Sequence, residues 1–179
     1  TAYEMEPDDF DNVRNFAATL FADEKYEEAQ EVYQTAMAQS PDNANIPIRI
    51  GQIYERMGDY EKALEYYEKS MEIEPNNANL AFNMGVLYMQ HSQDYEKANE
   101  AFKKATELNP DDYDALFNRG LALLNLKEFE ETVEIANKLI EMNPENCDAY
   151  DMLVTAHAGL DNKQQVNEAI RKGVECRGE

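Results

Sequence analysis

The sequence contains no hydrophobic run that approaches the roughly 18 apolar residues of a membrane-spanning helix. Basic residues are also scarce, with 16 Lys and Arg against 37 Asp and Glu and a net charge of −21. Nucleic acids and anionic membranes attract basic surfaces, so we expect neither nucleic-acid binding nor direct membrane insertion. The chain has no targeting segment at its start. Because it begins at Thr1, removal of an N-terminal leader stays open, and the compartment is unknown.

Cysteine and histidine are nearly absent. Cys147 and Cys176 are too few for a disulfide scaffold and lack the clustering of a zinc site. Free thiols are the expected state, and the alternative is a bridge, because the start and end of a helical hairpin lie close together. His91 and His157 are interpreted as hydrogen-bonded structural residues. No phosphate loop, GxSxG, HExxH or calcium-loop pattern occurs, so we expect no enzyme activity, metal site or cofactor.

Five of the six prolines form a regular series with intervals of 34 or 35 residues, and each is followed by acidic or amide residues. Proline cannot continue the preceding helix, and Asp or Asn caps the helix that follows. The series therefore predicts five repeats of two helices each. Their bounds are about 8–41, 42–75, 76–110, 111–144 and 145–179, and the longer third repeat is expected to hold its extra residue in the turn at 91–94.

Within the second repeat, small residues alternate with aromatic ones at helical spacing, as at Gly51, Tyr54, Ala63 and Tyr67. On these residues and the proline series, the chain resembles the tetratricopeptide repeat (TPR) family. The resemblance implies an all-α fold, a right-handed α-solenoid of antiparallel helix pairs whose first helices line a concave groove. Residues 8–179 then form a single TPR domain, and residues 1–7 are the tail of a preceding helix or repeat.

The family geometry assigns six positions of each first helix to the groove. On this assignment the groove is cationic in the first two repeats and apolar in the third and fourth, and Met152 of the fifth also faces it. The asparagines resemble a ladder that grips peptide backbone, because an amide both donates and accepts hydrogen bonds. The predicted partner-binding residues are Arg14, Asn15, Arg49, Gln52, Arg56, Phe82, Asn83, Val86, Met89, Phe117, Asn118 and Leu121.

One alternative accompanies this assignment, and a second candidate is rejected. Several of the apolar groove residues are also explained by packing between adjacent first helices. The carboxylate clamp of chaperone adapters is not an alternative, because only Asn83 matches its five positions in repeats two to four.

The leading hypothesis is a non-catalytic protein–protein interaction scaffold that binds an extended peptide or partner segment in the groove, without a cofactor. It is based on the low charge of the groove residues against a strongly acidic exterior. A second hypothesis is a self-assembling structural module in which the grooves or terminal repeats of like chains dock. A third is the docking array of a larger enzyme.

Overall fold

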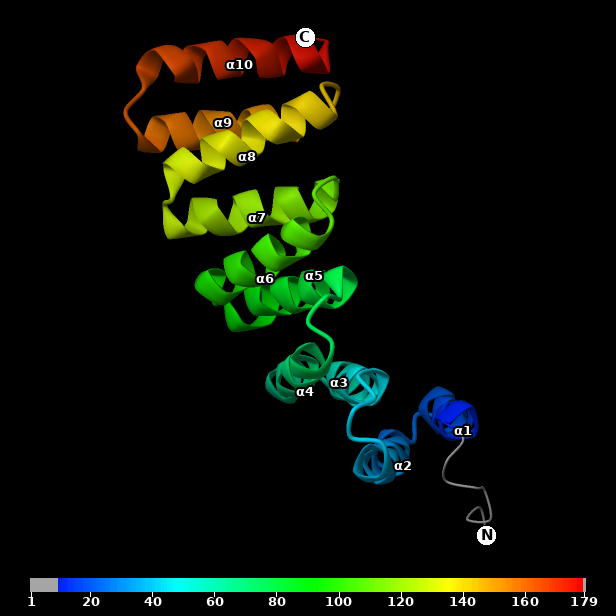
Figure 1. Ribbon diagram of the computed structural model, residues 1–179. Coiled ribbons are helices and arrows are strands. Elements are labelled where there is room, and N and C mark those ends of the chain that lie inside the picture. Colours follow the sequence, from blue (N-terminus) through cyan, green and yellow to red (C-terminus); the bar gives the residue numbers. More distant parts are fainter. Residues whose placement is uncertain (1–9, 179) are drawn as a thin grey trace. The chain divides into compact units, whose positions relative to one another are not determined.

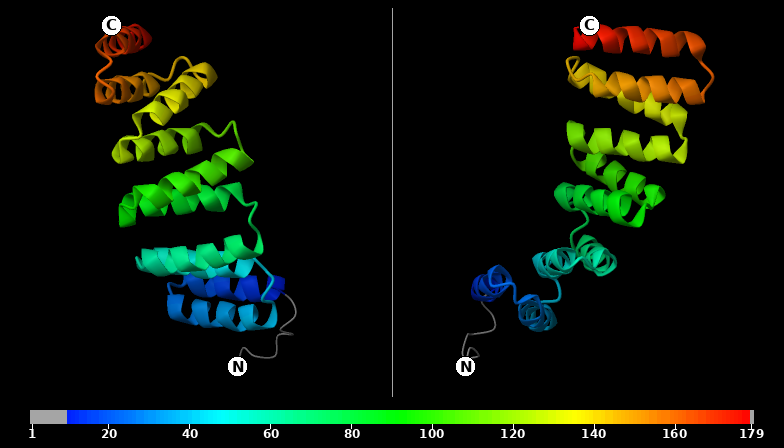
Figure 2. Two further views of the ribbon diagram at one scale, coloured as in Figure 1. Left: turned by 60° about the vertical axis from the view of Figure 1, so that its left-hand side comes forward. Right: turned by 180° about the vertical axis from the view of Figure 1, so that it is seen from behind.

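The computed structural model describes residues 10–178, and these residues form antiparallel helix pairs without a strand (Figures 1 and 2). Each pair corresponds to one predicted repeat. The expectation for residues 1–7 lies outside the described residues. The helices are α1 (Phe10–Ala22), α2 (Tyr26–Gln39), α3 (Asn45–Met57), α4 (Tyr60–Ile73), α5 (Ala78–Leu87), the π-helical turn η1 (Tyr88–Ser92), α6 (Tyr95–Leu108), α7 (Tyr113–Leu126), α8 (Phe129–Met142), α9 (Asp148–Gly159) and α10 (Lys163–Arg177).

Several helix starts follow from short acidic and amide side chains, whereas α2, α8 and α10 begin without a side-chain cap. The Asp112 carboxylate accepts a hydrogen bond from the backbone N–H three residues later, at 3.0 Å, and so caps α7 as the proline series predicts. Asp59 and Asp94 cap α4 and α6 in the same way. Asn43 and Asn146 act differently. The side-chain oxygen of each accepts a hydrogen bond from the backbone N–H two residues later, which belongs to the first residue of α3 or α9. None of the described helices has the length and apolar character that a membrane-spanning helix requires.

The described residues form two compact units, the N-terminal unit up to Asn77 and the C-terminal unit from Ala78 onward. In the N-terminal unit, α3 packs against both α2 and α4. Close approach of α3 and α4 depends on Gly51, where an added Cβ would lie 2.4 Å from the Tyr67 ring. The small-and-aromatic pattern of the second repeat therefore has the packing role that the sequence indicates.

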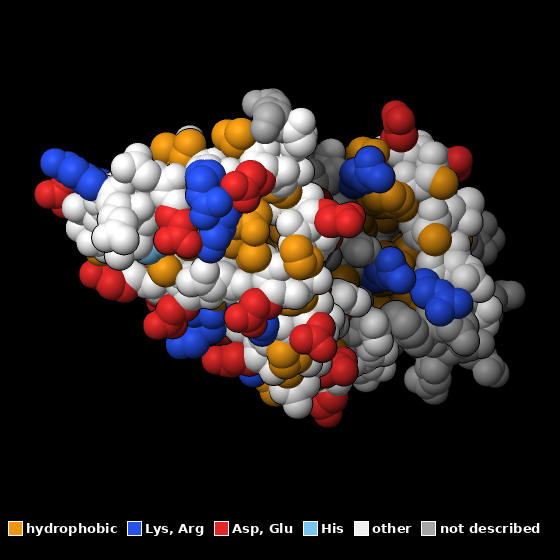
Figure 3. Space-filling model, turned by 90° about the horizontal axis from the view of Figure 1, so that it is seen from above, with side chains coloured by type: hydrophobic (Ala, Val, Ile, Leu, Met, Phe, Trp, Pro, Cys, Tyr) orange, Lys and Arg blue, Asp and Glu red, His pale blue; other side chains and the backbone are white. Residues whose placement is uncertain are grey.

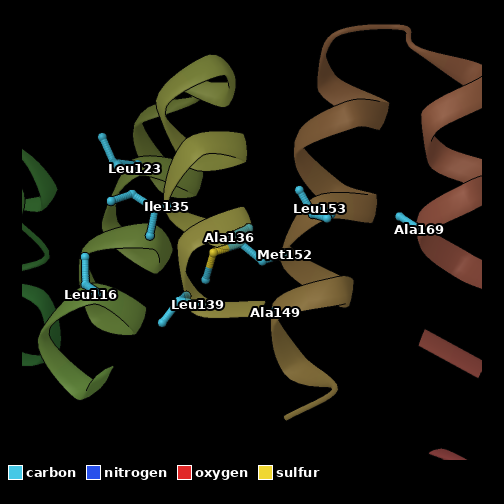
Figure 4. Packing of buried hydrophobic residues seen from close by; sticks show 9 residues of the cluster. All are labelled: Leu116, Leu123, Ile135, Ala136, Leu139, Ala149, Met152, Leu153 and Ala169. Carbon is cyan, nitrogen blue, oxygen red and sulfur yellow. The ribbon is translucent and has the colours of Figure 1, made fainter. Parts of the chain in front are cut away.

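In the C-terminal unit, a buried apolar cluster joins α7, α8, α9 and α10 (Figure 4). Met152 belongs to this cluster and is 3% exposed, so the expectation that it faces the groove is wrong. Figure 4 shows its side chain pointing from α9 toward α8 and α7. The reason is Gly120 on α7, because a Cβ at Gly120 would lie 2.5 Å from the Met152 sulfur. Met152 fills the space that glycine leaves.

The extra residue of the third repeat widens the last turn of its first helix. The backbone N–H of Asp94 donates to the carbonyl of Tyr88 at 3.0 Å, a bond that spans six residues. The corresponding bond of the second repeat, from Asp59 to Tyr54, spans five. The extra residue is therefore accommodated between Tyr88 and Asp94, in a segment that begins with η1 and includes the predicted turn at 91–94, because a π-helical turn takes in one more residue than an α-helical turn.

Cys147 and Cys176 form a disulfide, so the expectation of free thiols is wrong and the alternative is observed. Their Cα atoms are 5.8 Å apart, within the range that a disulfide needs. Cys147 immediately precedes α9 and Cys176 lies near the end of α10. In an antiparallel hairpin these two ends lie side by side, which is why the bridge forms.

His157 also departs from the expectation. Its Nδ1 atom is buried and has no hydrogen-bond partner among the described residues, so this nitrogen is not satisfied as predicted. The second repeat has Tyr54 at the same place, and its hydroxyl accepts a hydrogen bond from Gln30 at 2.8 Å. The residue 24 positions before His157, which corresponds to Gln30, is Val133, and a valine side chain offers no hydrogen bond. His91 is exposed in η1.

Candidate functional site

All twelve predicted partner-binding residues lie on the first helices of their repeats or in η1. Arg14 and Asn15 are on α1, Arg49, Gln52 and Arg56 on α3, Phe82, Asn83 and Val86 on α5, Met89 in η1, and Phe117, Asn118 and Leu121 on α7. The first five therefore belong to the N-terminal unit and the other seven to the C-terminal unit.

The N-terminal unit contains a pocket of about 300 Å³ between α1 and α3, with one contribution from α2. Three predicted residues line it, namely Arg14, Arg49 and Gln52. Its walls are otherwise mostly apolar, which is the usual composition of a ligand pocket with a few polar groups that fix orientation. The remaining lining residues are Ala17, Ala18, Phe21, Tyr33 and Ile53.

The polar groups of this pocket are two arginines, a glutamine and a tyrosine. Arg49 donates a hydrogen bond to the Gln52 side-chain oxygen at 2.9 Å, and both arginines are exposed. Tyr33 is buried, and burial raises the pKa of its hydroxyl, while the charges of Arg49 and Arg14 lower it. The phenol is therefore neutral at physiological pH, and the positive fields of both arginines reach it.

Arg56 borders the pocket through one of its wall residues. Its guanidinium carbon lies 5.9 Å from the centroid of the Phe21 ring, in cation–π contact. The same ring meets Tyr26 edge to face at 5.3 Å between centroids. Figure 3 shows basic side chains beside hydrophobic ones on its right-hand side, where the helices of the N-terminal unit lie. Arg14 and Arg49 thus line this apolar depression, and Arg56 contacts one of its wall residues.

The apolar predicted residues of the C-terminal unit are only half exposed. The Phe82 ring lies 5.7 Å from the Phe102 ring, and Phe117 stacks on Tyr113 at 6.4 Å between centroids. Phe117, Leu121 and the neighbouring Leu124 pack against the buried cluster. Packing therefore accounts for much of their surface, as the alternative interpretation expects.

The predicted asparagine ladder is uneven. Asn15 and Asn83 are exposed, whereas Asn118 is half buried. The Asn118 amide donates to the backbone carbonyl of Asp114 in its own helix, at 2.8 Å. A peptide at Asn118 would have to compete with this bond for the amide donor.

Acidic side chains are numerous, but no group of three or more His, Cys, Asp or Glu residues in the described part of the chain could hold a metal ion. The acidic residues nearest the helix starts are caps, such as Asp59 and Asp112.

Comparison with known families gives a direct result. A family model described as "Tetratricopeptide repeat" matches residues 10–74 and again 42–111, and a second model of the same description matches residues 82–146. The chain belongs to the TPR family. No curated protein matches it.

Solved TPR structures have the same fold. The crystal structure of YrrB, described as a TPR protein with an unusual peptide-binding site, is 23% identical, with a TM-score of 0.80 over 98% of this chain and 90% of YrrB. The crystal structure of MamA protein is 19% identical, with a TM-score of 0.76 over 93% of this chain and 90% of MamA. The predicted fold class, an all-α TPR solenoid, is confirmed.

Sequence reasoning did not include Tyr33 or Ile53 in the site. Both are framework positions in a TPR unit, where an aromatic or large apolar residue is expected to pack helices together. The useful signal was the pair of arginines on neighbouring first helices, because the TPR signature does not require them. Arg14 on α1 and Arg49 on α3 line the same pocket, and the framework side chains Tyr33 and Ile53 form part of its wall.

Proposed function

We propose that this protein is a non-catalytic interaction scaffold that binds an extended peptide, and that the pocket of the N-terminal unit is its principal recognition site. The observation that carries the proposal is the pocket itself. Two arginines from neighbouring first helices flank an apolar depression of about 300 Å³. TPR modules generally bind proteins without catalysing reactions, and YrrB, with the same fold, is described as having a peptide-binding site.

The chemistry of the lining defines the peptide. Arginine forms bidentate hydrogen bonds with carboxylates, so Arg14 and Arg49 suit an acidic side chain or a C-terminal carboxylate. The apolar walls, including Ile53 and Phe21, suit an adjacent aliphatic or aromatic side chain. The preferred ligand is thus a segment in which an apolar residue adjoins an acidic one.

The charge of the whole chain sharpens this preference. With a net charge of −21, most of the surface repels an acidic peptide, whereas the three groove arginines attract it. An acidic peptide is therefore directed to the pocket of the N-terminal unit. The half-exposed Phe82, Val86 and Met89 of the C-terminal unit are proposed as a separate set of apolar contacts within that unit.

The test uses short synthetic peptides that carry a fluorophore and differ only at two central positions: Leu-Asp, Leu-Asn and Gly-Asp. Fluorescence anisotropy measures their dissociation constants with the full chain. We expect Leu-Asp to bind most tightly, and we expect Arg49→Gln to weaken that binding by roughly tenfold, the size of one charge-assisted hydrogen bond at a partly exposed site.

Arg171→Gln is the matched control, because it removes the same charge from an exposed position on α10, no residue of which lines the pocket. It should leave the affinity unchanged apart from the small effect of net charge. Equal binding of all three peptides, or equal losses for Arg49→Gln and Arg171→Gln, would contradict the proposed site.

A further inference from the structure

The polar side chains that line the pocket of the N-terminal unit offer hydrogen-bond donors. Arg14 and Arg49 only donate, because a guanidinium has no acceptor atom. The side-chain oxygen of Gln52 accepts a hydrogen bond from Arg49 at 2.9 Å, which leaves the NH2 group of Gln52 as a donor. The Tyr33 hydroxyl stays protonated because burial raises its pKa, so it can donate as well. A ligand rich in acceptor oxygens therefore suits this lining.

The lining of the pocket is also distinct in charge. None of the described residues that line it is Asp or Glu, although the chain contains 37 of them. Glu55 is the only acidic residue of α3, and its carboxylate accepts a hydrogen bond from the Tyr67 hydroxyl at 2.7 Å. The lining of this acidic protein thus carries two positive side chains, Arg14 and Arg49, and a ligand with two negative charges complements them.

A phosphate monoester matches this lining better than a carboxylate does. A carboxylate has two oxygens and one negative charge, and the planar fork of a single arginine satisfies both oxygens. A phosphorylated side chain has three terminal oxygens and a charge of about −1.5 to −2 at pH 7. Its third oxygen and its additional charge provide a partner for the second arginine and for the neutral donors beside it. The donor set therefore exceeds what one carboxylate uses and suits a tetrahedral oxyanion.

We propose that the acidic group recognised by this pocket is a phosphorylated serine or threonine that adjoins an apolar residue of the peptide. This inference rests on the proposed function, because it names the ligand of the same site. Arg14 and Arg49 pair with the phosphate oxygens, and the Tyr33 hydroxyl donates to one of them. The walls at Phe21 and Ile53 hold the adjoining apolar side chain. Phosphorylation of the partner then switches binding on.

Other carriers of phosphate fit the molecule less well than a peptide does. Nucleic acids and phospholipid membranes present many negative charges, and a chain with a net charge of −21 repels them. Inorganic phosphate has no apolar group for the walls of the pocket, which include Ala17 and Ala18. A peptide supplies the phosphate and the apolar side chain together, so inorganic phosphate is used as a competitor in the test.

The test is fluorescence anisotropy of the full chain with four synthetic peptides that differ only at three central residues: Leu-Ser-Ala, Leu-Asp-Ala, Leu-Asp-Asp and Leu-phosphoserine-Ala. We expect the phosphopeptide to bind about tenfold more tightly than Leu-Asp-Ala, the size of one additional charge-assisted hydrogen bond. Leu-Asp-Asp is the control for charge, because it adds a second negative charge without a tetrahedral group, and it should bind less tightly than the phosphopeptide. Inorganic phosphate at the concentration of the phosphopeptide should not displace it.

Variants assign the preference for phosphate to the pocket. The quantity compared is the ratio of the dissociation constants of Leu-Asp-Ala and the phosphopeptide. Arg14→Gln and Arg49→Gln should each lower this ratio from about ten toward one, and Tyr33→Phe, which keeps the ring, should lower it by about threefold. Arg171→Gln should leave the ratio unchanged, because no residue of α10 lines the pocket. Circular dichroism confirms that each variant is folded.

The outcomes separate this inference from the proposed function. The phosphate assignment is overturned if the phosphopeptide binds no more tightly than Leu-Asp-Ala or Leu-Asp-Asp, if inorganic phosphate displaces it, or if the arginine variants keep the wild-type ratio. The proposed function survives each of these results when Leu-Asp-Ala still binds more tightly than Leu-Ser-Ala. If none of the four peptides binds, the proposed function fails and this inference fails with it.

Discussion

Reduction of the Cys147–Cys176 disulfide should destabilise the last helix pair selectively. The two cysteines are 29 residues apart, and they join the start of α9 to the end of α10. Closing a loop of that length in the unfolded chain has an entropic effect of about 3.5 kcal/mol at 25 °C on the chain-entropy model of disulfide stabilisation. The bridge constrains this hairpin alone, so its loss should appear first as local opening of α9 and α10.

Native-state hydrogen exchange measures this opening helix by helix. Since each 1.4 kcal/mol corresponds to a factor of ten, amide protection in α9 and α10 should fall by up to about 300-fold in the presence of a reductant. Helices α3 and α4 serve as the internal reference and should keep their protection. The double variant Cys147→Ser/Cys176→Ser should reproduce the reduced wild type. Unchanged protection of α9 and α10 after complete reduction would refute the reasoning.

Two further predictions concern packing and pH. Gly85→Ala should lower the free energy of unfolding by about 1–3 kcal/mol, because its Cβ would lie 2.6 Å from an aromatic ring, whereas Gly120→Ala should cost less because it meets the flexible Met152 side chain. Denaturant unfolding of both variants measures the difference, and equal losses would contradict this account. The pKa of Asp59 is lowered mainly by the hydrogen bond from Lys62, so the contribution of this cap to stability is present above the unfolded-state pKa of aspartate and is lost as the pH falls through the folded-state value. Carboxyl NMR titration should therefore give Asp59 a pKa below the ordinary value, and Lys62→Met should raise it toward that value; an unshifted pKa in the wild type would be inconsistent with the capping geometry.

The helix pairs could be predicted from the sequence because their determinants are local and recur. A proline that ends one helix and a short polar residue that caps the next act within a few positions of themselves, as Asp112 does for α7. The requirement for a small residue opposite a large one is similarly visible in Gly51 and Tyr67, which meet in one hairpin. Because the same local pattern recurs in five repeats, the helix pairs could be predicted from the sequence.

The errors arose where the outcome depends on a contact between repeats, on one substituted side chain, or on how closely two helix ends approach. Met152 was placed in the groove by its position, but the absence of a side chain at Gly120 of the preceding repeat draws it into the core. His157 Nδ1 has no partner among the described residues, and Val133 stands where Gln30 serves the tyrosine of an earlier repeat. The state of Cys147 depended on how closely two helix ends approach, which spacing alone allows but does not require.

The candidate site could be predicted from the sequence in part. Arg14, Arg49 and Gln52 could be chosen from the sequence because they are polar residues on first helices that the repeat framework does not need. The pocket itself could not be predicted, since it is lined by small side chains such as Ala17 and Ala18 beside a buried Tyr33. Whether the single TPR domain expected from the sequence acts as one body stays a prediction, and so does the groove across all five repeats.

The wide turn at η1 shows where this protein tolerates a change in length. The chain takes in an additional residue between Tyr88 and Asp94, yet α6 begins with the same aspartate cap as α4, and Phe102 still packs against Gly85. Helix-to-helix turns within a repeat can thus gain a residue while the packed faces on either side keep their partners. A peptide tag or spectroscopic label inserted beside Ser92 would lengthen a turn that already holds one additional residue. It would not change the first-helix residues of the N-terminal unit.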